Sequence, residues 1–350
     1  MADLKATKRD KTYAVDDGEK RGPLTLSRLR LHPTARFLLG QCADRRLAVW
    51  DLDAAPQKGK KGDAVAGALV CPHDAGWIRG FDVQPRGAWL ATGGSDRRLK
   101  LWKWENCQPA STPAHDVHAH EGWVEAVAFS PDGARIATVG ADRQVKLWDA
   151  EKLTLIKAVS AHAGFPRDAA FTPDGQWLVT GGEDGVAVVW DAATLEVVRR
   201  IDTGITSDQQ GQTPALGGII RLSVSHDGRW LGVGGDKQTL IFELGTGHGI
   251  ASIAQTGSDV LFGRRHDLLA AGEDTLRLWS FDPAKFSPKP APVKTDPKGK
   301  PLPPSLPVFS GKELTQIKRG GFSVGVAWAA DDGLLAAGKT DGTVEVWTLS

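Results

Sequence analysis

The sequence predicts an all-β protein built from a repeated unit, and three observations carry this prediction. Short apolar runs end in an aromatic residue at seven places along the 350 residues. Between them stand segments with alternating apolar and polar residues, which are joined by turns rich in Gly and Asp. No segment combines a 3.6-residue apolar period with helix-capping residues. The seven aromatic positions are Trp50, Trp102, Trp148, Trp190, Phe242, Trp279 and Trp347.

Taken in chain order, the first strand-like piece is residues 12–15, before the first repeat. The clearest repeat then predicts strand, turn, strand, turn and strand over residues 126–133, 135–142 and 144–149, with Pro131-Asp132-Gly133 as the first turn. Residues 169–191 repeat this pattern almost position for position. We therefore expect three strands in each clear copy, with the aromatic residue in the third.

These segments resemble the WD-repeat (β-transducin-like) family, and the resemblance covers about residues 22–350. The Trp-Asp pair itself stands at Trp50-Asp51, Trp148-Asp149 and Trp190-Asp191. The resemblance implies a β-propeller, a ring of four-stranded antiparallel blades. Seven copies imply a single seven-bladed propeller.

We expect residues 1–350 to form one propeller domain. The sequence stops directly after the last Trp strand, which leaves the last blade without an outer strand. An unpaired strand edge promotes aggregation. We therefore expect residues 1–21 to be an N-terminal tail whose strand closes the last blade, as is common in this family. Residues 282–307 hold nine of the 20 prolines and several lysines, which predicts a flexible insert between strands of the sixth blade.

The charge balance disfavours nucleic acid as a partner. The 43 Lys and Arg against 42 Asp and Glu give a formal net charge of +1, without the basic surplus typical of phosphate binding. No apolar stretch is long enough to span a membrane, and residues 1–10 are charged throughout. The three cysteines are far apart and do not suggest a disulfide framework. We expect a cytoplasmic protein that binds no membrane.

Three repeats carry His, Thr, Asp and Trp at matching offsets, with Thr-to-Asp and Asp-to-Trp separations of four and six residues. A hydroxyl, an imidazole and a carboxylate are also the parts of a catalytic triad. The family resemblance implies a structural hydrogen-bond network within each blade instead. The three tetrads are His73-Thr92-Asp96-Trp102, His120-Thr138-Asp142-Trp148 and His162-Thr180-Asp184-Trp190.

One further cluster has the residue types of a metal site. His115 and His118 lie a few residues after Cys107, and imidazole and thiolate are common zinc ligands. Because His120 belongs to a tetrad, few ligands are left, and we expect no metal or other cofactor.

The resemblance also implies contact positions on the top face of the ring, which flank the start of the first strand or precede the tetrad Asp. Aromatic residues and Arg at such positions are typical of interaction hot spots. Each ring could instead pack against the adjacent blade, and the sequence leaves both interpretations open. The positions are Trp77, Arg79, Ser95, Trp123, Glu125, Ala141, Phe165, Arg167, Glu183 and Phe322.

Taken together, these features predict a non-catalytic scaffold or adaptor. We expect a ring that is monomeric by itself and binds a protein or peptide on its top face. The alternative is a propeller-type hydrolase or lyase with its site at the mouth of the central channel. That alternative needs acids, His or a metal free to converge there.

Overall fold

The computed structural model describes most of the chain, and the fold is stated for that part. The described residues are 6–9, 11, 13–15, 26–42, 45–59, 62–73, 76–160, 162–205, 218–235, 238–254, 259–263, 267–271, 275–281, 306, 309, 312–318, 323–328, 333–339 and 342–349. Within these ranges all regular structure is β-strand, with no helix. It follows that the described part holds no helix able to cross a membrane. The all-β prediction is confirmed.

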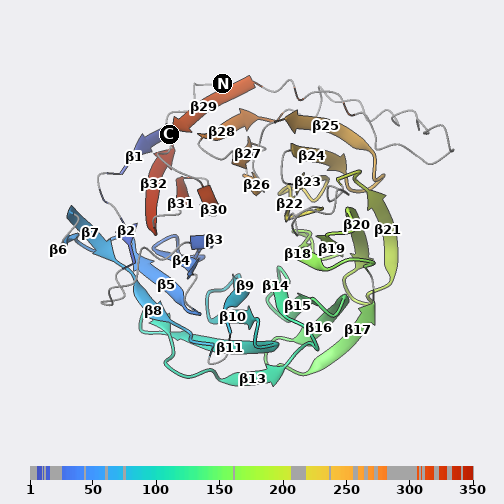
Figure 1. The fold of residues 1–350 in the computed structure, drawn as a ribbon, viewed down its shortest axis with the longest axis horizontal. Coiled ribbons are helices and arrows are strands. Elements are labelled where there is room, and N and C mark those ends of the chain that lie inside the picture. The colour runs from blue at the N-terminus through green and yellow to red at the C-terminus, as the bar shows by residue number, and fades with distance from the viewer. Residues whose placement is uncertain are drawn as a thin grey trace, which may run out of the picture.

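The described strands form seven small sheets arranged in a ring around a common axis (Figure 1). The innermost strands are β3, β9, β14, β18, β22, β26 and β30, and each contacts the next around the circle, with β30 returning to β3. This is the arrangement of a β-propeller, as the sequence predicts.

Five sheets have four strands, and within each the strands follow chain order outward from the channel. The first holds β3 (Leu26–Leu31), β4 (Phe37–Cys42), β5 (Leu47–Asp51) and β8 (Ala68–Val70). The next two hold β14 (Val124–Phe129), β15 (Arg135–Gly140), β16 (Gln144–Asp149) and β17 (Leu155–Ser160), then β18 (Pro166–Phe171), β19 (Trp177–Gly182), β20 (Val186–Asp191) and β21 (Val197–Asp202). The last two hold β22 (Arg221–Val224), β23 (Trp230–Gly234), β24 (Gln238–Glu243) and β25 (Gly249–Ala254), then β26 (Asp259–Phe262), β27 (Asp267–Ala271), β28 (Thr275–Ser280) and β29 (Lys312–Lys318).

Two sheets depart from the predicted four strands. One has five, namely β9 (Ile78–Val83), β10 (Trp89–Gly94), β11 (Arg98–Glu105), β13 (His115–His118) and the short β12 (Gln108–Pro109), which pairs with the end of β11. The other has seven: β30 (Ser323–Trp328), β31 (Leu334–Lys339), β32 (Thr343–Leu349), β1 (Ala6–Lys8), β2 (Tyr13–Ala14), β7 (Gly62–Ala66) and β6 (Gln57–Gly59). The prediction of four strands in every blade is therefore wrong for these two.

The N-terminal segment pairs with the last strand of the chain. Two strands do so, β1 along residues 347–349 of β32 and β2 along residues 343–344. The sequence indicated only residues 12–15 for this position. Strand β2 also pairs in parallel with β7, a strand of the excursion between β5 and β8. Tyr13 is fully buried here, and its hydroxyl donates to the Leu52 carbonyl oxygen at 3.2 Å.

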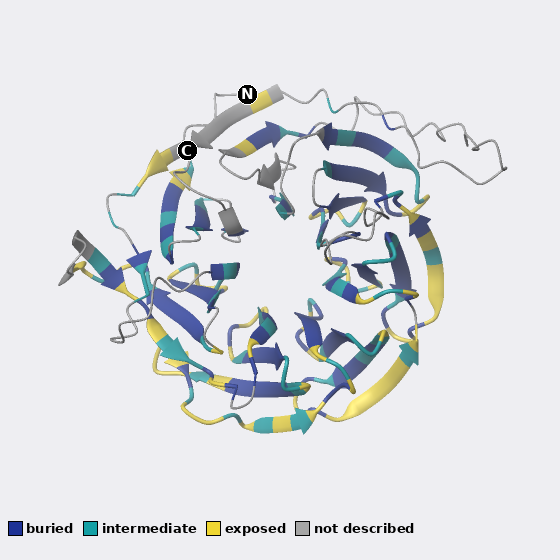
Figure 2. Ribbon diagram, viewed as in Figure 1, coloured by how far each residue is buried: buried dark blue, intermediate teal, exposed yellow. Residues whose placement is uncertain are grey.

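The apolar residues of the described part form seven buried clusters, and the main ones lie between neighbouring sheets. One joins β5 and β9–β11, for example, and another joins β32, β2 and the first sheet. Burial is concentrated in the inner strands, whereas the outermost strands β17 and β21 are largely exposed (Figure 2). Because these clusters contain side chains from two neighbouring sheets, packing between adjacent blades stabilises the ring.

The predicted Pro-Asp-Gly turns join the first and second strands of a sheet. Gly133 and Gly175 have φ angles of 72° and 71°, a left-handed conformation that glycine adopts without steric cost. The second strand then starts two residues after the glycine, at Arg135 and Trp177.

Of the predicted insert 282–307, only Leu306 is among the described residues, and it is buried in the cluster that joins β20 with β22–β24. The rest of that insert lies outside the described part.

Candidate functional site

The innermost strands of three consecutive sheets begin with the same local irregularity. In β9, β14 and β18 one residue has no partner on the neighbouring strand, and these extra residues are Arg79, Glu125 and Arg167. A bulge of this kind re-aims a side chain. All three side chains line one cavity at the mouth of the central channel.

An exposed aromatic side chain precedes each of these bulges by two residues. Trp77, Trp123 and Phe165 are 56%, 48% and 38% exposed, respectively. Their carbonyl oxygens accept hydrogen bonds from the N–H groups of Ser95, Ala141 and Glu183, respectively. The structure thus brings together nine of the ten predicted contact positions, as three similar groups on one end of the ring. Phe322, the tenth, lies outside the described residues.

A charged network links these three sheets across their boundaries. The Arg79 guanidinium lies 4.6 Å from the Trp123 ring centroid, and its Nε donates to Glu125 Oε2 at 2.9 Å. Arg167 Nη1 reaches the same oxygen at 3.5 Å, and its Nη2 pairs with Glu183. Arg79 therefore covers part of the Trp123 ring, which still stays about half exposed.

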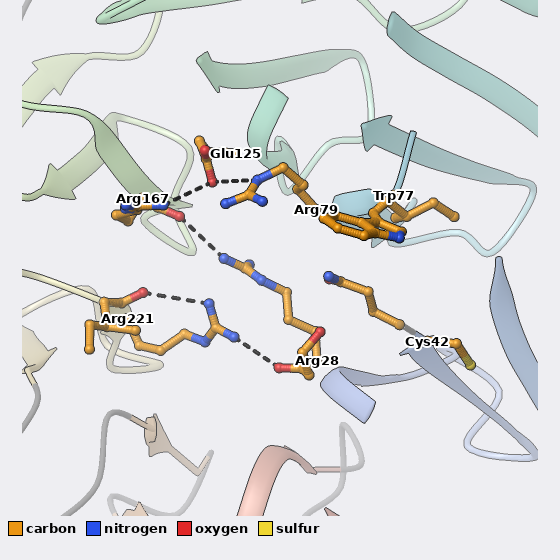
Figure 3. A pocket seen from close by; sticks show the side chains of 11 residues that line it. Arg28, Cys42, Trp77, Arg79, Glu125, Arg167 and Arg221 are labelled. Atoms are coloured by element: carbon orange, nitrogen blue, oxygen red, sulfur yellow. Dashed lines mark hydrogen bonds and ion pairs between the residues drawn. The ribbon is translucent and has the colours of Figure 1, made fainter. Parts of the chain in front are cut away.

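The cavity at the mouth encloses about 430 Å³ and is rich in arginine (Figure 3). Besides the three bulge residues and Trp77, its lining includes Arg28, Gln41, Cys42 and Arg221. These four residues were not predicted from the sequence. Arg221 could have been found by one signal, because Ile220-Arg221 at the start of β22 matches Ile78-Arg79 at the start of β9. Arg28 lies in a more diverged repeat, where the bulge in β3 is not visible from the sequence.

Arginine side chains cross the channel beneath this cavity. Arg28 Nη1 lies 3.0 Å from Asp168 Oδ1, and the two side chains are only 6% and 5% exposed. Arg221 Nη2 donates to the Ser27 carbonyl oxygen at 3.0 Å, and Arg221 Nε lies 3.2 Å from Asp259 Oδ1. These bonds connect β3 with β18 and β22 on the other side of the ring (Figures 1 and 3).

The charged side chains around Asp168 and Arg221 shift the pKa values of these two residues. Burial alone would raise the pKa of Asp168, but the positive charges of Arg28 and Arg221 outweigh it, so its pKa lies below the usual range. Burial and the neighbouring Arg28 lower the pKa of Arg221. The arginines therefore create a positive environment at the channel mouth.

The four members of each predicted tetrad are hydrogen-bonded in a chain. In the blade of β14–β17, His120 Nδ1 lies 2.9 Å from Asp142 Oδ1 and His120 Nε2 lies 2.8 Å from Thr138 Oγ1. The Trp148 indole Nε1 donates to the same hydroxyl at 2.9 Å. The other two tetrads have the same bonds at 2.8–3.2 Å. A neutral His protonated at Nδ1 satisfies every polar atom in such a chain.

The tetrads are closed to solvent. The three histidine side chains and the three threonines are 0% exposed. Burial alone would raise the pKa of Asp142, but the hydrogen bond and charge of His120, together with the backbone N–H groups of Gln144 and Glu121, outweigh it and the pKa falls to about 2. Burial lowers the pKa of His120 despite that bond. Each threonine hydroxyl is bonded to two partners and therefore links neighbouring strands. Because it has no exposed surface, no substrate can reach it.

The histidine cluster is divided between the two faces of a strand. His115 and His118 are three residues apart in β13, so they point to opposite faces. Cys107 is exposed and, like the buried Cys42 and Cys71, is a free thiol. Among the described residues, no three His, Cys, Asp or Glu side chains come together in a metal-binding group.

Four segments match the family model of the WD domain, G-beta repeat: residues 69–103, 111–149, 153–191 and 312–348. Each match runs from the outermost strand of one sheet to the third strand of the next. The ring of sheets defines a β-propeller, and four segments of this ring are WD repeats.

A relative from Oryza sativa subsp. japonica, the small ribosomal subunit protein RACK1y, is 30% identical over 138 residues. This alignment covers 38% of the present chain and 35% of the rice protein. The chain thus spans about a third of the length of the relative it matches.

Proposed function

We propose that this chain is a non-catalytic interaction scaffold that binds a protein or peptide at the channel mouth, on the face marked by Trp77, Trp123 and Phe165. The observation that carries the proposal is the exposure of these three aromatic side chains at corresponding positions of consecutive sheets. Exposed aromatic residues next to arginine are typical of binding hot spots. The WD-repeat family supports a scaffold role.

The supporting structure is rigid beneath this surface. Each aromatic residue precedes a strand of a blade whose tetrad is complete, and its carbonyl oxygen is bonded to the residue before the tetrad Asp. Side chains held in place on a rigid element lose little conformational entropy on binding. We infer that the three blades from β9 to β21 present one preformed contact surface.

The proposal extends to the whole chain. We propose that residues 1–350 form a single domain in which each of the seven sheets is one blade, with residues 1–21 closing the last. We further propose that the ring is a monomer by itself and works in the cytoplasm. It needs no cofactor, nucleic acid or membrane for this role.

The enzymatic alternative has little support from the described side chains. Glu125, the carboxylate in the cavity lining, is held by Arg79 and Arg167. The tetrad hydroxyls have no exposed surface. A hydrolase or lyase would need an acid or nucleophile that is free to reach substrate.

A pull-down from native lysate tests the interaction surface. We expect the wild-type chain to capture a partner that a Trp123→Ala/Phe165→Ala variant loses by about tenfold or more, since hot-spot truncations cost 2 kcal/mol or more each. The readout is quantitative mass spectrometry of the captured proteins.

The chain offers a matched control for this experiment. Leu155 and Val197 on the outer strands β17 and β21 are 50% and 46% exposed, so Leu155→Ala/Val197→Ala removes two similarly exposed apolar side chains elsewhere. We expect this variant to capture the partner as the wild type does. If both variants behave alike while all three chains melt alike, the proposed surface is wrong.

A further inference from the structure

The walls of the mouth cavity hold hydrogen-bonding groups that the fold leaves unused. Among the described residues, Arg79 bonds only through Nε, so its two Nη groups have no partner. The buried Glu125 Oε1 and Gln41 Oε1 also have none within the described part. Glu125 is only 5% exposed. Buried acceptors such as these two oxygens need a hydrogen-bond donor, which either water or a ligand can supply.

The cavity lining carries more positive than negative charge. Four arginines line it against one carboxylate, that of Glu125. The other acids paired with these arginines, Asp168, Glu183 and Asp259, do not line the cavity. Asp168 and Asp259 are only 5% and 13% exposed. Glu183, in contrast, is 32% exposed beside Arg167, so the positive excess belongs to the groups that line the cavity.

We propose that this cavity is the anchor subsite for an acidic peptide, and that it accepts an Asp or Glu side chain of the partner at the two Nη groups of Arg79, whose Nε is bonded to Glu125. This inference rests on the proposed function and adds the chemistry of the partner. A carboxylate matches the planar fork of N–H donors that a guanidinium offers. Trp77, Trp123 and Phe165 then contact the apolar residues that flank the acidic one.

The unused acceptors favour a peptide carboxylate over a phosphate group. A peptide brings backbone N–H donors that can reach the Glu125 and Gln41 oxygens, whereas an inorganic or phosphoryl anion brings acceptors only. A phosphoserine also carries nearly two negative charges. It would be repelled more strongly by Glu125 and by the acids behind the arginines.

Peptide pools test this subsite directly. We would use three biotinylated nine-residue pools with randomised flanks and a fixed central residue, which is Glu, Gln or phosphoserine. Binding of the full chain to each pool is measured by biolayer interferometry. We expect the Glu pool to bind about tenfold more tightly than the Gln pool, the effect of one charge-assisted hydrogen-bonded pair. We expect that preference to shrink as NaCl is raised from about 50 to about 300 mM.

Two arginines of the same blade serve as site variant and control. Arg79 starts the innermost strand β9 at the mouth, whereas Arg86 is exposed in the turn after that strand, at its other end. Arg79→Gln should bring the Glu-to-Gln ratio close to one. Arg86→Gln should leave the ratio as in the wild type. Thermal melts check that both variants are folded, and the salt dependence of the wild type does not rely on either variant.

The outcomes separate this inference from the function it rests on. If the wild type binds Glu and Gln pools equally, but loses both in the Trp123→Ala/Phe165→Ala variant, the acidic anchor is wrong and the interaction surface stands. Tighter binding of the phosphoserine pool would overturn the choice of a carboxylate. A chain that binds no pool overturns the inference, and the lysate experiment then decides on the proposed function.

Discussion

At the scale of single residues, one threonine hydroxyl organises each complete tetrad. Thr138 accepts a hydrogen bond from Trp148 and lies 2.8 Å from His120 Nε2, so it joins the second strand, the third strand and the preceding loop. The sequence predicted these four residues together because their spacing is fixed by strand and turn lengths. The spacing alone could not decide between structural and catalytic chemistry, which depends on burial.

Removing the tetrad charge should weaken the fold. We expect Asp142→Asn to lower the free energy of unfolding by about 1–3 kcal/mol, because a neutral amide replaces a charged acceptor in a buried network. Urea denaturation followed by tryptophan fluorescence measures the change. As a control, Asp53→Asn alters a carboxylate whose side chain is 70% exposed and should cost less than about 0.5 kcal/mol.

The pH dependence of the stability difference between wild type and Asp142→Asn gives a second readout. The pKa of Asp142 is about 2 in the folded chain and near its ordinary value of 3.8 in the unfolded chain. The contribution of its charge is therefore complete above pH 3.8 and is lost as the pH falls toward 2. The stability gap between wild type and Asp142→Asn should narrow below about pH 4. A gap that stays constant down to pH 3 contradicts this assignment.

At the scale of elements, the repeat and the sheet are offset by one strand. Each matched repeat contributes the outermost strand of one sheet and three strands of the next. Neighbouring sheets are therefore linked covalently as well as by their shared apolar cluster. Where the chain ends, the same offset leaves β32 in need of an outer partner, which β1 and β2 supply.

The N-terminal strands should therefore be essential to stability. Deleting residues 1–20 removes both pairings with β32 and the Trp50 Nε1 hydrogen bond to the Ala14 carbonyl oxygen. We expect a sharply lower melting temperature. Tyr13→Ala alone should cost about 3–5 kcal/mol as a buried aromatic truncation, and Tyr13→Phe only about 1 kcal/mol for the lost hydrogen bond. Differential scanning calorimetry checks all three; an unchanged melt of the deletion rules out this role.

Local sequence patterns predicted the strands that repeat and missed those that do not. Strands β14–β16 and β18–β20 follow directly from alternation and turn chemistry. Strands β6 and β7 contain a polar, Gly-rich stretch, and β7 is paired by β2 from the far N-terminus. A pairing across about 50 residues depends on the closed ring and leaves no local pattern to read.

At the scale of the whole molecule, the channel mouth is built by residues far apart in sequence. Arg28 and Asp168 are 140 residues apart and Arg221 and Ser27 are 194 apart. The sequence predicted the arginine, glutamate and aromatic residues of three adjacent blades because those blades share a clear motif. It could not predict Arg28, since that contact requires the ring to close and to place opposite strands face to face.

The buried ion pair across the channel should therefore act as a unit. Arg28→Met removes the ion-pair partner of Asp168, which keeps the Leu222 N–H and the nearby charge of Arg221. Asp168→Asn removes the ion-pair partner of Arg28, which keeps the Arg167 carbonyl oxygen. We expect each change to cost about 3 kcal/mol, because breaking a buried ion pair leaves a buried charge that is poorly compensated. The Arg28→Met/Asp168→Asn double variant removes both charges and should be more stable than the sum of the single losses by about 1–3 kcal/mol. Urea unfolding of all four chains gives this coupling energy. Losses that add within about 0.3 kcal/mol would mean that water already screens the pair. A strong coupling would instead mean that β3 and β18 are held together across the channel as well as through the blades between them.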